Sequence, residues 1–146
     1  MPAAQDISSD PVFAASFKDL EGKPQPLRQW RGRVLVLNFW APWCLPCREE
    51  IPDFIKLQEK YRDRGLMFIG VALDDSAKVR VSADEMGINY TILLGEMDAA
   101  DMAGKIGNEV GGIPFTVVID RSGKIVASKV GKMNLSRLEE ITSPLL

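Results

Sequence analysis

The stretch that decides the fold of this protein reads NFWAPWCLPCREE, residues 38–50. It holds the only two cysteines of the chain, Cys44 and Cys47, directly after an apolar run and directly before a helical pattern. Two thiols at this spacing can close a disulfide within one helical turn. The first sulfur would lie at a helix N-terminus, where unpaired backbone N–H groups and the helix dipole favour an anion. That position lowers a thiol pKa from about 8.5 toward about 7 or below, and since only the thiolate attacks, the pattern predicts redox chemistry.

The residues on either side of the cysteine pair predict a buried strand followed by a long helix. Residues 34–40 are apolar except for Asn38, which is typical of a central strand covered on both faces. Pro42 cannot donate to a strand ladder, so the strand should end just before it. From about residue 44 to residue 64, apolar residues recur at three- and four-residue spacings, and Gly65 would end this helix.

The rest of the chain alternates predicted strands and helices. A strand over 12–17, a turn, and a return over 26–30 predict an N-terminal hairpin. Further strands are expected at 66–73, 89–94, 115–120 and 125–130, and further helices at 77–86, 98–106 and 135–141. Crossover helices imply parallel pairs early in the chain, and the tight turn at 121–124 implies an antiparallel pair late. The sequence therefore predicts an α/β fold with a mixed sheet.

Length and composition fit one soluble globular domain. A chain of 146 residues can bury about two-thirds of its unfolded surface, and the predicted division is a flexible lead-in at 1–11 and a single domain at 12–146. The net charge of −2 gives no basic surface for nucleic acid, and no apolar run has the length of a membrane span. The lead-in lacks the charged and apolar regions of a signal peptide, which leaves open a cytosolic protein or one whose leader is absent.

The chain contains no histidine. This excludes histidine-based catalytic triads, haem ligation by histidine and Cys₂His₂ zinc sites, while two cysteines cannot form a four-thiolate metal site within one chain. We therefore expect no metal and no separate cofactor, with the Cys44–Cys47 disulfide itself as the redox group.

Three residues of the stretch are candidates for catalysis. Cys44, at the helix start, should be the more exposed sulfur and the nucleophile, and Cys47, one turn further, should be the resolving thiol. A purely structural disulfide is the alternative, but a three-residue loop gains little from cross-linking. Glu50 lies on the same side of the helix as Cys47, where it could move a proton or raise the thiol pKa values. A solvated glutamate in the first helical turn is the simpler alternative, and Glu49 fits that role better.

The segment Trp43-Cys44-Leu45-Pro46-Cys47 resembles the W-C-x-P-C active site of the thioredoxin superfamily. The flanking residues 37–42 and 48–52 resemble its TlpA/ResA branch of extracytoplasmic thiol–disulfide oxidoreductases, and the likeness runs from about residue 15 to about residue 132. The resemblance implies a thioredoxin fold: a mixed central sheet flanked by helices, with an N-terminal β-hairpin and a central helix–strand insertion.

The same resemblance implies roles for further residues. Asn38 stands where cytosolic thioredoxins have a buried aspartate; asparagine cannot shuttle a proton, so that duty would pass to Glu50. Ile113-Pro114 matches the superfamily's cis-proline, whose preceding backbone would pair with an extended substrate and whose ring keeps metals off the thiolates. Trp43 would form part of an apolar rim where a partner protein docks.

The two residues between the cysteines, Leu45 and Pro46, would tune the redox potential. We expect Trp40 to be core and Trp30 to pack in the core or the hairpin.

The leading functional prediction is a thiol–disulfide oxidoreductase that reduces disulfides of partner proteins outside the cytoplasm. The family resemblance implies a periplasmic or extracytoplasmic location, rather than a cytoplasmic one, and a membrane electron donor. Cytochrome c maturation or a related pathway is one family possibility.

Three other classes are alternatives to this prediction. A peroxiredoxin-like thiol peroxidase has Pro and Thr or Ser before its reactive cysteine, whereas Pro42 and Trp43 precede Cys44 here, with no Thr or Ser between Asn38 and Cys44. A copper chaperone on this scaffold would resemble C-x-x-x-C with a distant histidine, which this chain lacks. A non-enzymatic thioredoxin-like binding module stays open.

Overall fold

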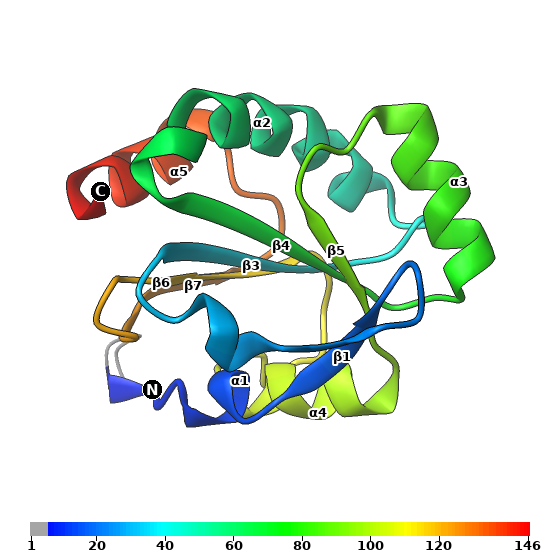
Figure 1. Ribbon diagram of the computed structural model, residues 1–146, viewed down its shortest axis with the longest axis horizontal. Helices are drawn as coiled ribbons and strands as arrows, with labels where there is room; N and C mark the ends of the chain where they lie inside the picture. Colours follow the sequence, from blue (N-terminus) through cyan, green and yellow to red (C-terminus); the bar gives the residue numbers. More distant parts are fainter. Residues whose placement is uncertain (1–5) are drawn as a thin grey trace.

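The computed structural model describes residues 6–146, and the strand that precedes the cysteines forms its centre (Figure 1). Strand β3 (Val34–Trp40) is buried along its whole length. It pairs in parallel with β4 (Leu66–Ala72), which pairs in parallel with β5 (Thr91–Leu94). On its other side, β3 pairs antiparallel with β6 (Phe115–Ile119), and β6 pairs antiparallel with β7 (Ile125–Val130). The predicted early parallel pairs and late antiparallel pair are confirmed.

A hairpin completes the sheet beyond β5. Strand β1 (Ser16–Asp19) pairs antiparallel with β2 (Pro24–Pro26) and with β5. The resulting order is β2-β1-β5-β4-β3-β6-β7. The α/β class, the mixed sheet and the N-terminal hairpin are therefore confirmed.

The hairpin boundaries predicted from the sequence were wrong. The predicted strand over 12–17 begins instead with a short helix, α1 (Asp10–Phe13), because Pro11 occupies its first turn and Val12 and Phe13 are both buried rather than alternating. The predicted return over 26–30 is a 3₁₀ helix (Leu27–Trp30), in which Leu27 is buried and Trp30 packs against the same apolar cluster. Side chains three residues apart eclipse in such a helix, so both reach the core.

Helices cover both faces of the sheet, as Figure 1 shows. One face is covered by α2 (Leu45–Tyr61), α3 (Ser76–Met86) and α5 (Leu135–Thr142); the other by α1 and α4 (Met97–Lys105). The predicted helices are confirmed, with their boundaries shifted by no more than a few residues. Helix α2 passes into a 3₁₀ turn (Arg62–Arg64) that ends at Gly65 with φ 92°, a left-handed conformation that glycine adopts without steric cost.

The predicted lead-in falls partly outside the described residues. Residues 1–5 lie outside them. Ile7 packs against the apolar core, and the Ser9 hydroxyl donates a hydrogen bond to the Gly123 carbonyl. The fold therefore includes residues before position 12, while the division into a lead-in and one domain stays a prediction. Among residues 6–146, no helix has the length and apolar character to cross a membrane.

Candidate active site

The two cysteines form a disulfide at the N-terminus of α2. Cys44 is the N-cap residue, with an extended backbone (φ −91°, ψ 106°), and its Sγ accepts a hydrogen bond of 3.4 Å from the Cys47 backbone N–H. Cys44 is 6% exposed and Cys47 is 0% exposed. The expected order of exposure is confirmed, although Cys44 itself presents little surface.

The residues around Cys44 form an exposed rim. Trp43 is 70% exposed and Leu45 is 68% exposed, while Pro46 is exposed in the first turn of α2. A proline is tolerated there because its missing N–H would have no partner within the helix. Trp40, by contrast, is fully buried, which confirms its predicted place in the core.

The loop before β6 lies against the disulfide. The Ile113–Pro114 peptide bond is cis, as the resemblance implied. Ile113 packs on the apolar cluster that contains Cys44 and Cys47. Pro114 is buried, and its carbonyl accepts a hydrogen bond of 2.7 Å from Gly131 N–H, which ties the loop to the end of β7.

Glu50 is buried next to the central strand. Its side chain is 0% exposed; Oε2 accepts a 2.7 Å hydrogen bond from Met133 N–H, and Oε1 accepts one of 3.3 Å from Asn38 Nδ2. Burial raises the pKa of Glu50 from 4.5 to about 7, although the two hydrogen bonds and the positive charges of Lys132 and Lys129 act in the opposite direction. The alternative of a solvated glutamate in the first turn is wrong.

The sequence did not single out two of the groups that hold Asn38 and Glu50. Thr116 is fully buried, and its hydroxyl accepts a 3.0 Å hydrogen bond from Asn38 Nδ2, because the two residues are partners across β3 and β6. A threonine within the otherwise apolar strand FTVVI was the available signal. Met133 contributes a backbone N–H, which no residue pattern could reveal.

Further buried polar atoms lie on the same face of the sheet. Asn38 Oδ1, Trp40 Nε1 and the Tyr90 hydroxyl are buried without a hydrogen-bond partner among the described residues. A side chain at Gly70 would come within 3.0 Å of Trp40 Nε1 and 3.3 Å of Tyr90 Cε1, so glycine makes room for both rings. Burial, and then the charge of Glu50, raise the pKa of Tyr90. Within residues 6–146, no group of three or more His, Cys, Asp or Glu side chains is arranged to hold a metal ion.

The Cys44–Cys47 disulfide lies at a helix N-terminus, above a mixed sheet and beside a cis-proline. This combination defines a thioredoxin-fold thiol–disulfide oxidoreductase. The family model described as Redoxin matches residues 3–142. The thiol–disulfide oxidoreductase ResA of Bacillus thuringiensis (strain Al Hakam) is 31% identical over 122 residues, which cover 83% of this chain and 68% of that protein. The thioredoxin-like protein YneN of Bacillus subtilis (strain 168) is 34% identical over 130 residues, covering 86% and 72%.

A solved structure shares the architecture over nearly the whole chain. The thiol:disulfide interchange protein of Chlorobium tepidum TLS, a thioredoxin family protein, is similar with a TM-score of 0.83 and 28% identity, covering 92% of this chain and 94% of that one. The chain belongs to the Redoxin family and is a TlpA/ResA-like member of the thioredoxin superfamily, a thiol–disulfide oxidoreductase whose redox pair is Cys44 and Cys47.

Proposed function

We propose that this protein reduces disulfides of partner proteins outside the cytoplasm, with Cys44 as the attacking thiol and Cys47 as the resolving thiol. The observation that carries the proposal is the place of Cys44. It caps α2, is the more exposed of the two cysteines, and shares its apolar cluster with Ile113 of the cis-prolyl loop. A substrate sulfur can therefore approach Cys44 but not Cys47.

The reaction proceeds as two thiol–disulfide exchanges. The Cys44 thiolate attacks one sulfur of the substrate disulfide, a mixed disulfide forms, and the other substrate sulfur leaves as a thiolate. The Cys47 thiolate then attacks Cys44 Sγ, which breaks the mixed disulfide and releases the second substrate thiolate. The substrate disulfide gains two electrons and two protons, and the protein is left with the Cys44–Cys47 disulfide.

Glu50 is suited to accept and return the proton of Cys47. It lies one helical turn after Cys47 on α2, and a carboxyl whose pKa is about 7 can change protonation readily near neutral pH. Asn38 and Met133 N–H position this carboxyl by their hydrogen bonds. The buried amide of Asn38 cannot itself take the proton, which supports assigning proton transfer to Glu50.

The remaining site residues would bind the substrate or tune the redox potential. The exposed Trp43 would contact the substrate chain, and the Ile113 backbone would pair with it in extended form. Leu45 and Pro46 form the first turn between the sulfurs and would set the redox potential. A potential near −270 mV or lower supports a reductant, whereas one near −120 mV would indicate an oxidant and contradict the proposed direction.

The location and pathway in this proposal rest on the TlpA/ResA likeness. Such a protein would act on the outer side of the membrane and receive its electrons from a membrane donor. Apocytochrome c cysteines are one substrate class that this proposal includes.

Single-cysteine variants test the mechanism. With dithiothreitol as electron donor, Cys44→Ser should lose the insulin reduction that exceeds the rate of dithiothreitol alone, because the remaining thiol, Cys47, is 0% exposed and cannot be reached by the substrate disulfide. Cys47→Ser is the matched control: it keeps the attacking sulfur and should accumulate a mixed disulfide visible by mass spectrometry. Reduction of insulin by Cys44→Ser at the wild-type rate would end the proposal.

A further inference from the structure

Several large apolar side chains are exposed to solvent. Among the described residues these are Trp43, Leu45, Val81, Met97, Val110 and Val130. The first two flank Cys44. A side chain at Gly112 would meet Val130 at 3.0 Å and Val110 at 3.9 Å, so these two valines flank the cis-prolyl loop. Exposed apolar patches of this kind mark interaction sites.

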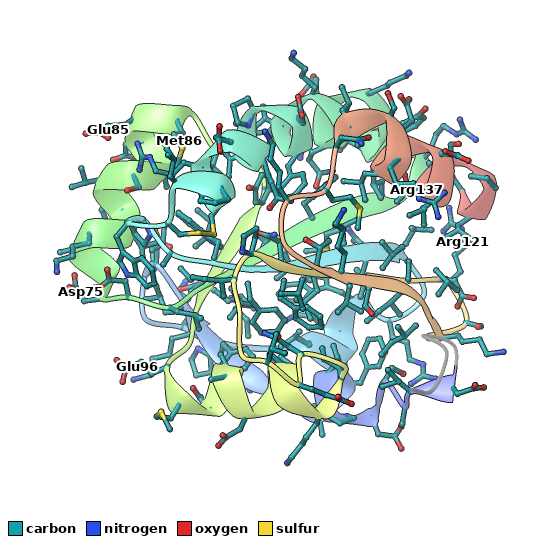
Figure 2. All side chains as sticks on the ribbon, turned by 180° about the vertical axis from the view of Figure 1, so that it is seen from behind. Asp75, Glu85, Met86, Glu96, Arg121 and Arg137 are labelled. Atoms are coloured by element: carbon teal, nitrogen blue, oxygen red, sulfur yellow. A yellow bond between two sulfur atoms is a disulfide. The ribbon has the colours of Figure 1, made fainter. Side chains whose placement is uncertain are left out.

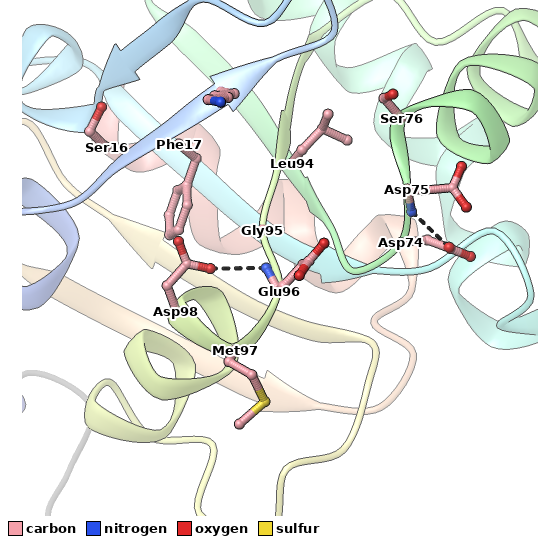
Figure 3. A pocket seen from close by; sticks show the side chains of 11 residues that line it. Ser16, Phe17, Asp74, Asp75, Ser76, Leu94, Gly95, Glu96, Met97 and Asp98 are labelled. Carbon is pink, nitrogen blue, oxygen red and sulfur yellow. Dashed lines mark hydrogen bonds between the residues drawn. The ribbon is translucent and has the colours of Figure 1, made fainter.

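A groove begins beside Trp43, the residue before Cys44. Its first part, about 500 Å³, lies between Trp43 and α3 and includes Val81 and Asp74. Its second part, about 670 Å³, lies between the loops that follow β4 and β5 and includes Asp74, Glu96 and Met97 (Figure 3). Asp74 lines both parts, so they adjoin at this residue. We call this surface, lined by residues 16–18, 42–43, 74–78, 81–82 and 94–98, the α3–α4 groove.

Helix α3 is fixed against the active site, so the groove has a defined shape. Arg48, on the first turn of α2, donates 3.3 Å hydrogen bonds to the Pro42 carbonyl and to Ser82 Oγ. These bonds hold α3 beside the residues that precede Cys44. Val81 is thereby presented next to Trp43.

The α3–α4 groove is acidic. Four carboxylates line it, those of Asp74, Asp75, Glu96 and Asp98, against the two ammonium groups of Lys18 and Lys78. Figure 3 shows that the carboxylates come from both loops.

The carboxylates of the groove differ in their availability to a ligand. Asp75 and Asp98 accept hydrogen bonds from backbone N–H groups at the starts of α3 and α4, and Lys78 lies 3.9 Å from Asp75. Glu96, by contrast, has no side-chain hydrogen bond or ion pair within the described part of the chain. It is therefore available to a cation.

Two lysines near Glu50 carry the opposite charge. Lys129 and Lys132 lie near enough to Glu50 to lower its pKa. Figure 2 shows Asp75, Glu85 and Glu96 on one side of the molecule and Arg121 and Arg137 on the other.

We propose that the α3–α4 groove binds a flank of the substrate polypeptide that carries an apolar residue and a Lys or Arg near the reactive cysteine. The apolar residue would contact Trp43 and Val81, and the cation would reach Asp74 and Glu96. Two strand spacings separate β3 from β5, about 10 Å, which an extended chain covers in about three residues. The cation is thus expected two to four residues from the substrate cysteine. This inference rests on the proposed function, since it specifies that function's substrate.

Disulfide peptides that differ at one position test the inference. Two peptides carry Lys three residues before or after the reactive cysteine, and their counterparts carry Gln there. At low ionic strength, one Lys peptide should be reduced about fivefold faster than its counterpart, and Asp74→Asn with Glu96→Gln should bring this ratio below twofold. Both changes preserve shape, and the amide oxygen introduced at position 74 can still accept the hydrogen bond from the Asp75 N–H.

The matched control changes the same charge elsewhere on the same helices. Asp84→Asn with Asp101→Asn removes two exposed carboxylates of α3 and α4 that do not line the groove. An equal loss of selectivity in this control, or no Lys preference in the wild type, would overturn the inference. Reduction of the small neutral hydroxyethyl disulfide should be unchanged in all variants; if the wild type reduces neither this compound nor insulin, the proposed function itself fails.

A binding measurement keeps the inference testable without turnover. The oxidised protein is titrated with the preferred Lys peptide in which Ser replaces the cysteine, and backbone amide shifts are followed by NMR. Shifts should concentrate at residues 74–78 and 95–98. Shifts confined to other surfaces would contradict the placement of the substrate.

Discussion

The two faces of the central strand β3 bury different kinds of side chain. Leu35, Leu37 and Phe39 point into a wholly apolar cluster beneath α1 and α4. On the opposite face, beneath α2, the alternating position Asn38 contacts Glu50 and Thr116. One strand thus contributes a hydrocarbon core on one side and a hydrogen-bonded polar cluster on the other.

The apolar face of β3 stabilises the fold, whereas the face beneath α2 buries a titratable carboxyl. Burying apolar surface stabilises the fold, whereas a buried carboxyl is favourable only when protonated or well hydrogen-bonded. The buried Glu50 carboxyl on the α2 face therefore lowers stability near neutral pH. We expect mutations on the two faces to separate these effects.

The largest effect is expected on the apolar face. Phe39→Ala removes a fully buried ring whose centroid lies 5.7 Å from that of Phe115, and it should lower the free energy of unfolding by about 3–5 kcal/mol. Urea denaturation measures this change. The rate of thiol–disulfide exchange per folded molecule should stay close to that of the wild type. A large fall in that rate would contradict the expectation that the apolar face affects stability alone.

The next effect is a pH dependence from Glu50. Because its pKa is raised from 4.5 to about 7 on folding, the folded state holds a proton that the unfolded state has lost. Stability is therefore greatest below pH 4.5 for this group and falls as the pH rises to about 7, by about 3 kcal/mol. Four other carboxyls have lowered pKa values, so they affect stability only at pH values below this range: those of Asp19, Asp75, Asp120 and Glu139.

Glu50→Gln should abolish that pH dependence. Urea midpoints of the oxidised protein between about pH 4.5 and about pH 8 should decline in the wild type and stay level in the variant. The pH profile of insulin reduction should change as well if Glu50 moves the Cys47 proton. Parallel stability curves for the two proteins would mean that Glu50 does not titrate in this range.

The smallest effect concerns the packing of the polar face. Gly70→Ala would place a methyl group 3.0 Å from Trp40 Nε1 and should destabilise the protein by about 1–2 kcal/mol. Gly104→Ala on α4 is the matched control, because no atom lies within 4 Å of the added carbon. It should stabilise the protein by about 0.5–1 kcal/mol through helix propensity. Stabilisation by both substitutions would show that the α2 face is less tightly packed than described.

Local patterns in the sequence predicted most of the architecture. The apolar run before Cys44 and the periodic residues after it predicted β3 and α2, because strand alternation, helix periodicity and proline's missing N–H act over a few residues. The prediction was wrong around α1, where Val12 and Phe13 have the composition of a strand but pack as one helical turn. Tertiary burial overrode local propensity there.

The sequence by itself determined the redox pair, its place at a helix start and, through family likeness, the cis-proline. Only the tertiary structure decided that Glu50 is buried and bonded to Met133 N–H, 83 residues away, and that Asp74 and Glu96 line one groove. Burial and hydrogen-bond partners depend on which distant segments the sheet brings together. No spacing along the chain encodes them.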